Sequence, residues 1–343
     1  MHEAFGEQFQ IQPGYLNTAS TGVPPLRVGR RVASAVEDWY TAAHPNASFD
    51  AEVDAARAAF ATLVGADPDR VAIGSAVSSL IGMVAAGVPD GTRVLTAAEE
   101  FGSVVRPFAV HADRGVTITE VDLEALPERV ADHDLVTVSV TQSRDGRTVD
   151  LAALRAAAER TGARVLLDVS QAAGWQPLSL GWADWLVGVS HKWLLSTNGA
   201  CWLACSERGL AEARPSAASW YAADDRWNNL YGASAALHPG ARGLDTSPIW
   251  HAHLGAAEAL PWLVSLDLAS VRAHCVGLAD LLLERLDLAP RDSAIVALDL
   301  PDGAGSLAEQ GIAASVRSGR VRLSFHLYNT EEDVDRVVRA LRS

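Results

Sequence analysis

The chain has 343 residues, 49% of them hydrophobic, and a formal net charge of -14 at pH 7. This length allows one large domain with a smaller one, or two comparable domains. The acidic balance and the lack of a basic patch argue against a nucleic-acid partner. No apolar run is long enough to cross a bilayer and the first ten residues lack signal-peptide order, so we expect a cytoplasmic protein with no membrane partner.

The first part of the chain has two helical patterns. Residues 24–43 begin with two prolines, as helices often do, and predict the first helix. Residues 48–65 predict the second, with Ser48 as its N-terminal cap and Gly65 as its end.

Short β-branched or apolar runs follow, and most are separated by helical stretches such as residues 150–162. This alternation predicts an α/β fold with a mainly parallel sheet sandwiched by helices. Cys201 and Cys205 alternate within the last run and, with Cys275, read as core thiols rather than a disulfide framework or a metal site. The predicted strands are residues 70–74, 92–97, 115–121, 135–140, 164–169, 185–189 and 200–205.

The sequence pattern changes near Trp250. Two long helical patterns, strands at residues 294–300 and 321–327 and a final helix at residues 330–341 predict a small C-terminal α+β domain. The predicted organisation is an N-terminal segment (1–14), a large domain (15–248) and a small domain (249–343).

Ligands of open parallel sheets bind at the carboxyl ends of the strands, so polar residues there are candidate site residues. Ser75 lies between a predicted strand and a helix, where backbone amides attract phosphate; an ordinary serine cap would look the same. Phe101 follows another strand and would either cover an aromatic ligand or fill the core.

Two more strand ends bear charged residues. Asp168, three residues before Gln171, would either pair with a protonated ring nitrogen of a ligand or serve as a turn residue. Lys192, after the apolar run 185–189, would either lose its proton readily or extend to water.

Together these features resemble the class V aminotransferase and cysteine desulfurase-like superfamily of fold-type I enzymes that use pyridoxal 5'-phosphate (PLP). The resemblance covers nearly the whole chain, and its most specific motifs are D-x-x-Q (Asp168, Gln171), S-H-K (Ser190, His191, Lys192) and R-x-S-x-x-x-Y-N near the end. It implies a large domain with a mainly parallel seven-stranded sheet, a small C-terminal α+β domain and a homodimer with shared active sites.

The resemblance also implies roles for single residues. Lys192 would form the Schiff base with the cofactor, and Asp168 would pair with its pyridine nitrogen. Arg322 and Asn17 would contact an amino acid-type substrate. The remaining implied cofactor contacts are Ser75, Ala76, Val77, Phe101, Ser143, Gln171, Ser190 and His191, together with Thr246 and Ser247, which would reach the phosphate from the neighbouring subunit.

The chain departs from this family pattern at two places. Val77 stands where a threonine is common in the phosphate turn, so Ser75 or Ser78 would have to supply that hydroxyl. The segment 309–321, where desulfurases have their catalytic cysteine, contains none, which disfavours a persulfide mechanism.

The expected activity is of the PLP-dependent aminotransferase type, acting on an amino acid or an amino acid conjugate. The alternatives are a C–S lyase acting by beta-elimination, an amino acid epimerase, and a non-catalytic binding protein on the same fold. An NAD-binding protein is disfavoured because no G-x-G-x-x-G follows an early strand. The aromatic loop 219–232 would line the substrate pocket or pack as a surface loop at the dimer interface.

Overall fold

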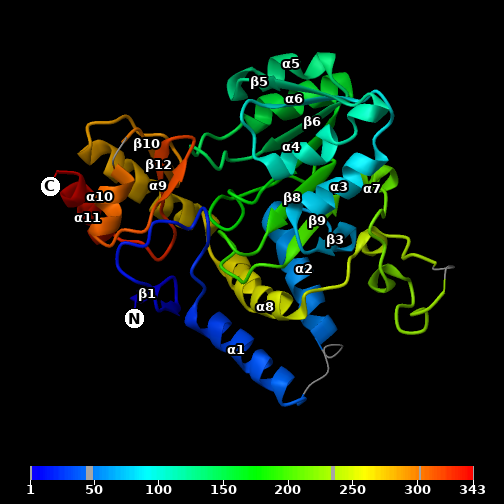
Figure 1. Ribbon diagram of the computed structural model, residues 1–343, viewed down its shortest axis with the longest axis horizontal. Helices are drawn as coiled ribbons and strands as arrows, with labels where there is room; N and C mark the ends of the chain where they lie inside the picture. Colours follow the sequence, from blue (N-terminus) through cyan, green and yellow to red (C-terminus); the bar gives the residue numbers. More distant parts are fainter. Residues whose placement is uncertain (1, 44–48, 233–235, 301–302, 343) are drawn as a thin grey trace.

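The computed structural model describes residues 2–43, 49–232, 236–300 and 303–342. A large α/β body forms most of the molecule, and the C-terminal elements lie at one end of its long axis (Figure 1). Each helix in these ranges lacks the combination of length and apolar character that crossing a bilayer requires.

The N-terminal region forms a short antiparallel hairpin and two helices. The hairpin pairs β1 (His2–Ala4) with β2 (Glu7–Phe9). Pro25 precedes α1 (Leu26–Tyr40), and α2 (Asp50–Val64) ends at Gly65, whose φ of 73° is left-handed. Because glycine adopts this conformation at no steric cost, the predicted end of the second helix is confirmed. Ser48, its predicted cap, lies outside the described residues.

The central sheet has seven strands in the order β3-β9-β8-β7-β6-β4-β5. Neighbours from β8 to β5 are parallel, whereas β9 pairs antiparallel with both β8 and β3. This confirms the predicted α/β fold with a mainly parallel seven-stranded sheet. The strands are β3 (Val71–Gly74), β4 (Arg93–Ala97), β5 (Thr117–Val121), β6 (Leu135–Ser139), β7 (Arg164–Asp168), β8 (Trp185–Val189) and β9 (Cys201–Cys205).

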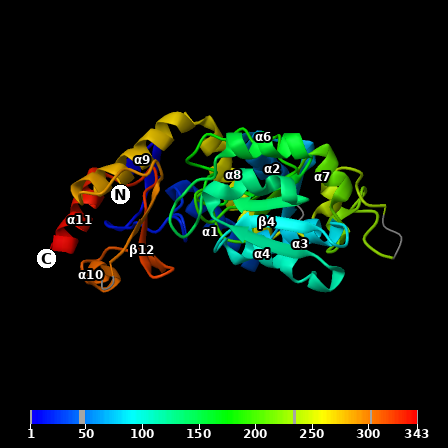
Figure 2. The ribbon, with the colours of Figure 1, turned by 90° about the horizontal axis from the view of Figure 1, so that it is seen from above.

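Helices cover both faces of this sheet. Side chains alternate along each strand, so that Leu166 packs with the core under α3 and α4, while Val165 and Leu167 join the core under α2, α6 and α8. Figure 2 shows α2 and α6 on one side of the sheet and α3 and α4 on the other. These helices and their short neighbours are α3 (Val77–Gly87), α4 (Gly102–Ala109), α5 (Leu126–Arg129), α6 (Leu151–Thr161), α7 (Glu207–Glu212) and α8 (Trp250–Ser265).

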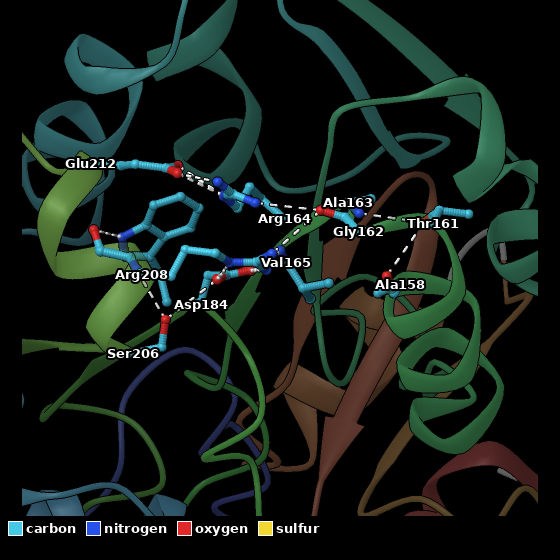
Figure 3. Close-up of polar contacts among 12 residues, drawn as sticks. Ala158, Thr161, Gly162, Ala163, Arg164, Val165, Asp184, Ser206, Arg208 and Glu212 are labelled. Carbon is cyan, nitrogen blue, oxygen red and sulfur yellow. Dashed lines mark hydrogen bonds and ion pairs between the residues drawn. The ribbon is translucent and has the colours of Figure 1, made fainter.

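Ion pairs fix α7 near the amino ends of β7 and β8 (Figure 3). The Arg164 guanidinium forms a salt bridge with Glu212, with Nε 2.9 Å from a carboxylate oxygen, and Arg208 Nη2 lies 2.6 Å from Asp184 Oδ2. Since Asp184 Oδ2 also accepts a hydrogen bond from the amide of Val165, this network joins α7 to both strands. It lies at the amino ends of the strands, away from their carboxyl ends.

The C-terminal elements form a three-stranded antiparallel sheet with helices. The order is β10-β12-β11, and the short β11, whose Val316 and Arg317 are exposed, lacks an apolar pattern and was not predicted. The elements are α9 (Leu268–Arg285), β10 (Ile295–Leu298), α10 (Gly303–Glu309), β11 (Ser315–Arg317), β12 (Arg320–Ser324) and α11 (Glu331–Arg342).

The two parts of the molecule are joined by long helices. Helix α8 packs against α1 and α2 in the large core, whereas α9 contributes Val271 to that core and Leu282 to the C-terminal core. The N-terminal segment also reaches the C-terminal part, because Asn17 forms a bridge with Ser324 of β12. The domain limits at residues 14 and 248 stay predictions.

Candidate active site

The strand ends named by the sequence meet on one side of the central sheet. Gly74 at the end of β3 and Val189 at the end of β8 both pair with Cys201, the first residue of antiparallel β9. Asp168 at the end of β7 pairs with Ser139 and with Val187. The residues that follow β3, β7 and β8 therefore lie along the same carboxyl-end side, as the parallel arrangement predicts.

Lys192 lies on this side with its amine close to an aromatic ring. Its Nζ is 5.4 Å from the centre of the Phe101 ring. Burial lowers the pKa of Lys192, and the positive charges of Arg322 and Arg317 lower it further, while the charge of Asp168 opposes them. The amine is therefore more easily deprotonated than an exposed lysine.

The sequence contains a further signal that pattern analysis missed. Lys192 is the single lysine in the 343 residues, and every other basic residue counted with it is an arginine. Apart from the N-terminal α-amine, amine chemistry on this protein therefore reports on Lys192 alone.

The N-terminal segment packs very closely against the lysine loop, the turn after β8 that bears Lys192. The amide of Gly22 donates to the carbonyl of His191 at 2.8 Å. A Cβ atom on Gly22 would lie 1.9 Å from the carbonyl oxygen of Lys192, so only glycine fits there. The loop itself turns at Leu195, whose φ is 51° and whose amide donates to the Lys192 carbonyl at 3.2 Å.

Asp168 is buried, with 4% of its surface exposed. Its Oδ1 accepts a hydrogen bond from the amide of Ser170 at 2.8 Å, which matches the turn interpretation. No hydrogen bond from the described residues reaches Oδ2, so the carboxylate retains accepting capacity for a ligand. Burial raises the pKa of Asp168, and the positive charge of Lys192 opposes this rise.

Gln171 links the site to its surroundings. Its Nε2 donates to the carbonyl of Ala19 at 2.9 Å, and its Oε1 accepts from the Trp193 indole at 2.7 Å. Because an amide nitrogen has two hydrogens, one N–H remains for the cofactor contact that the sequence predicts.

Phe101 does not fill the core, because 46% of it is exposed. The preceding residue, Glu100, was missed by sequence analysis and fixes its backbone. The half-buried Glu100 carboxylate accepts from the Phe101 amide at 2.7 Å, the Ser139 amide at 2.9 Å, the Ser139 hydroxyl at 2.7 Å and Gln142 Nε2 at 2.7 Å. It thereby joins the loop after β4, which bears Phe101, to the end of β6.

The start of α3 is open to a ligand. Ala76 occupies its N-cap with no side-chain cap hydrogen bond, so Ser75 is not an ordinary cap, and Ser75 and Ser78 are both exposed. Val77 is the first helical residue. The amides of this first turn lack helical partners, which favours an anion.

Ser190 and His191 differ in whether their side chains can still form a hydrogen bond with a ligand. The Ser190 hydroxyl donates to the carbonyl of Thr197 at 2.5 Å, so its hydrogen is already used. His191 Nδ1 is buried with no hydrogen-bond partner among the described residues, and burial lowers the pKa of His191 to about 4. The neutral ring can therefore still offer a hydrogen bond.

The segment with Thr246 and Ser247 runs along the edge strand β3. The Thr246 amide donates to the carbonyl of Ile73 at 3.2 Å, while its buried Oγ1 has no partner in the described ranges. Ser247 is exposed. This places an unused hydroxyl beside the end of β3.

Arg322 of β12 reaches the site from the C-terminal part and is 2% exposed. Its Nη1 donates to the carbonyl of Ser143, its Nη2 donates to Ser20 Oγ at 2.7 Å, and its Nε donates to Ser315 Oγ at 3.1 Å. An arginine has five N–H groups, so two remain for a substrate. Asn17 Oδ1 is buried and unpartnered in the part of the chain that the structure describes.

The aromatic loop packs largely on itself and on α8. The Trp220 ring lies 5.1 Å from Trp227 and 6.5 Å from Trp250 between centroids, and the buried Tyr221 donates to Asp50 at 2.8 Å. Tyr231 is almost fully exposed. Within one chain this matches the surface-loop interpretation, and its place in a substrate pocket stays a prediction.

The comparisons with known proteins agree with this geometry. The family model "Aminotransferase class-V" matches residues 14–299, so the chain belongs to the class-V aminotransferase family. It is a PLP-dependent enzyme of this class, which confirms the resemblance found in the sequence.

Individual relatives differ in their activities. The chain is 28% identical to the uncharacterized aminotransferase YcbU of Bacillus subtilis, over 81% of this chain and 80% of that protein. It is 26% identical to isopenicillin N epimerase of Streptomyces clavuligerus, over 95% and 93%. The solved complex of the cystine C–S lyase C-DES with cysteine persulfide shares the fold, with a TM-score of 0.86, 20% identity and coverage of 97% and 99%.

The residues present fit PLP. An amine with a lowered pKa, a buried carboxylate with an unused oxygen and an exposed aromatic ring lie on one side of the sheet with an uncapped helix start. The unpartnered His191 Nδ1 and Thr246 Oγ1 are further buried polar atoms that a ligand would satisfy.

Proposed function

We propose that this protein is a PLP-dependent aminotransferase-type enzyme that acts on an amino acid or an amino acid conjugate through Lys192. The observation that carries this proposal is the position of the only lysine, with its amine 5.4 Å from the Phe101 ring centre and a lowered pKa. When bound, PLP supplies an aldehyde that condenses with an amine and a ring that accepts electrons.

Lys192 has two tasks in this proposal. Its neutral amine would hold the cofactor, and the same amine would take the proton from the substrate's alpha carbon. Asp168 would keep the ring nitrogen positively charged, because a buried carboxylate next to that atom favours the protonated form. Phe101 would cover one face of the ring, and Gln171 would donate its free N–H to the cofactor oxygen.

The phosphate contacts follow from the open groups near the ends of β3 and β8. Ser75, Ala76 and Val77 provide backbone amides at the start of α3, His191 provides its unpartnered Nδ1, and Ser190 supports the turn through Thr197. Thr246 and Ser247, supplied by the neighbouring subunit, would provide hydroxyl groups, and Ser143 would lie near the cofactor oxygen.

Arg322 and Asn17 orient the substrate. The two uncommitted N–H groups of Arg322 can pair with both oxygens of an alpha-carboxylate, which a lysine in its place would not do. Asn17 Oδ1 is placed to accept from the substrate, since it is buried without a partner in the described residues.

A desulfurase mechanism is disfavoured by the cysteines. All three are buried, and burial raises the pKa of the Cys201 and Cys205 thiols to about 12, so neither is a nucleophilic thiolate at neutral pH. Beta-elimination and epimerisation remain the alternatives, because both begin with the same proton removal by Lys192. Transamination comes first because it needs no further acid or base.

The test uses the single lysine. Borohydride reduction of holoprotein followed by mass spectrometry of peptides is expected to find the cofactor on Lys192. Incubation with amino acids, with a 2-oxo acid present, is expected to give a new amino acid. Pyruvate with ammonia would instead identify a lyase, inverted substrate an epimerase, and cofactor found elsewhere would contradict the site.

We also propose a cytoplasmic homodimer with shared active sites. Trp39 and Tyr40 at the end of α1 and Ile249 just before α8 are large apolar side chains that are more than 40% exposed. Their exposure supports a subunit interface at this end of α1 and α8. Free buried thiols are typical of a reducing compartment. Light scattering of the purified protein tests the dimer, and a mass of one chain would contradict it.

A further inference from the structure

A cavity of about 730 Å³ lies beside the proposed active site, between the loop after β6 and the C-terminal part. This volume is typical of small-molecule sites. Five arginines and only two carboxylates contribute to its lining, although the whole chain has a net charge of -14. The lining consists of Glu99, Arg144, Asp145, Gly146, Arg147, Arg291, Arg317, Ser318 and Arg320.

Two of the arginines are neutralised by their neighbours. Arg144 forms ion pairs with Glu99 and Asp145. Arg147 Nε lies 3.1 Å from Asp145 Oδ2, and its Nη1 lies 3.1 Å from Glu124 Oε1. These two side chains therefore shape the wall of the cavity without leaving a net charge there.

The other three arginines lack such partners. Among the described residues, no carboxylate lies within ion-pair distance of Arg291, Arg317 or Arg320. The Arg291 Nη1 donates to the carbonyl of Ala297 at 3.1 Å, which orders the side chain but does not neutralise it. The cavity therefore has an unbalanced positive charge.

The hairpin β11–β12 places two of these charges opposite each other. Arg317 pairs with Arg320 in the strand register, across a turn at Ser318 and Gly319 with φ values of 46° and 74°. Like charges at directly opposite positions destabilise a strand pair. An anion bound between the two guanidinium groups would relieve this repulsion.

The cavity adjoins the place proposed for the substrate's alpha-carboxylate. Ser20 Oγ accepts from Arg322 Nη2 at 2.7 Å and from Arg317 Nη2 at 3.4 Å. Ser143, whose carbonyl accepts from Arg322, directly precedes Arg144 of the cavity wall. A substrate held by Arg322 would therefore have this cationic cavity within reach of its side chain.

We propose that the substrate carries a second anionic group, a carboxylate, sulfonate or phosphate, at the far end of its side chain, and that Arg317, Arg320 and Arg291 bind it. This inference rests on the proposed function of Lys192 and Arg322. It makes Arg320 a specificity-determining residue, because no described contact competes for its guanidinium.

The experiment compares amino acids that differ in the negative charge of the side chain. The affinity of holoenzyme for glutamate and glutamine is measured by calorimetry and by the cofactor absorbance, with cysteate and phosphoserine against serine as the sulfonate and phosphate arms. In at least one arm, binding of the anionic member is expected to be on the order of tenfold tighter, and this preference is expected to fall with added salt.

Variants test the assignment to these arginines. Arg320→Gln and Arg317→Gln are each expected to remove most of the preference, and Arg320→Gln is expected to leave binding of the neutral amino acid within about twofold. Arg339→Gln removes an exposed arginine of α11 and serves as the charge-matched control, with the preference unchanged. If no arm shows a preference, or Arg339→Gln reduces it equally, the inference is wrong.

The inference and the proposed function fail in distinguishable ways. If borohydride places the cofactor on Lys192 but the anionic and neutral amino acids of each pair bind alike, only the anion site is excluded. If the cofactor is not on Lys192, the proposed function fails, and with it the basis of this inference.

Discussion

The amine of Lys192 faces the Phe101 ring, with Nζ 5.4 Å from the ring centre, and no carboxylate lies within ion-pair distance of it in the described ranges. An aromatic face attracts a cation only weakly. Burial disfavours the charged amine more strongly than Asp168 supports it, since the pKa of Lys192 is lowered. The arrangement thus favours a neutral, nucleophilic amine at the centre of the site.

Lys192→Ala is expected to lower turnover on the order of 10²- to 10⁴-fold, because the variant lacks the base. Without an ion pair to lose, and with the cost of burying the amine removed, the apo variant is expected to resist denaturant at least as well as the parent. Assays and chemical denaturation measure both. Since no other lysine exists, covalent cofactor on the variant could be only at the N-terminal amine, and normal turnover would remove Lys192 from the mechanism.

Asp168→Asn is expected to shift the reactivity of Lys192 to lower pH. The Asp168 charge raises the pKa of Lys192, so its removal leaves burial, Arg322 and Arg317 to lower that pKa further. The neutral amine then becomes the main form at a lower pH than in the parent. The rate at which apo protein reacts with an amine-specific reagent, measured against pH, checks the direction; a shift to higher pH would contradict it.

The lowered pKa of Lys192 is also expected to make the stability of the apo protein depend on pH. Because the folded pKa of Lys192 is below its unfolded value, the unfolded chain binds more protons between the two values, and the free energy of unfolding rises with pH in that window. Denaturation of the parent and of Lys192→Met across this range isolates the contribution. Equal pH dependence of the two proteins would show that the amine titrates normally in the fold.

The sequence predicted the strands well because the inner strands are short and buried on both faces, as the apolar run of β8 shows. It did not predict that β9 is antiparallel, since apolar runs do not encode direction. Asp168 and Lys192 were found because each follows such a strand. Glu100 was missed because its role depends on Ser139 and Gln142, which lie about 40 positions away and meet it only in the folded sheet.

Gly22→Ala is expected to impair the site although it adds only one methyl group. The new Cβ would lie 1.9 Å from the Lys192 carbonyl oxygen, so either the lysine loop or the N-terminal segment must move. We expect weaker cofactor binding and a loss of about 1–3 kcal/mol in the free energy of unfolding. Absorbance titration with PLP and urea denaturation measure the two effects.

Gly29→Ala is the matched control for that substitution. Gly29 lies on the exposed face of α1, and a Cβ there has nothing within 4 Å. Alanine is expected to stabilise this helix by up to about 1 kcal/mol and to leave cofactor binding unchanged. Equal effects of the two substitutions would refute the close-approach argument.

Arg57 and Asp245 form a buried pair that holds the Thr246 segment against β3. Their side chains are 2% and 0% exposed, with Nη2 to Oδ2 at 2.8 Å and Nη1 to Oδ1 at 3.1 Å, and the Ile73 amide donates to the same Oδ1 at 2.8 Å. Asp245→Asn keeps an oxygen for Ile73 but leaves the buried Arg57 charge with only the more exposed Asp54, whose Oδ1 lies 3.5 Å from Nε. A loss of about 3–5 kcal/mol in the free energy of unfolding is expected, measured by urea denaturation.

A double variant separates charge from shape at this pair. Arg57→Met combined with Asp245→Asn removes the buried charge, and we expect it to recover much of the stability that Asp245→Asn alone loses. If the pair also positions the Thr246 hydroxyl for the cofactor phosphate, PLP affinity is expected to stay reduced in the double variant. Full recovery of PLP affinity together with stability would show that the pair supports the fold and does not position Thr246.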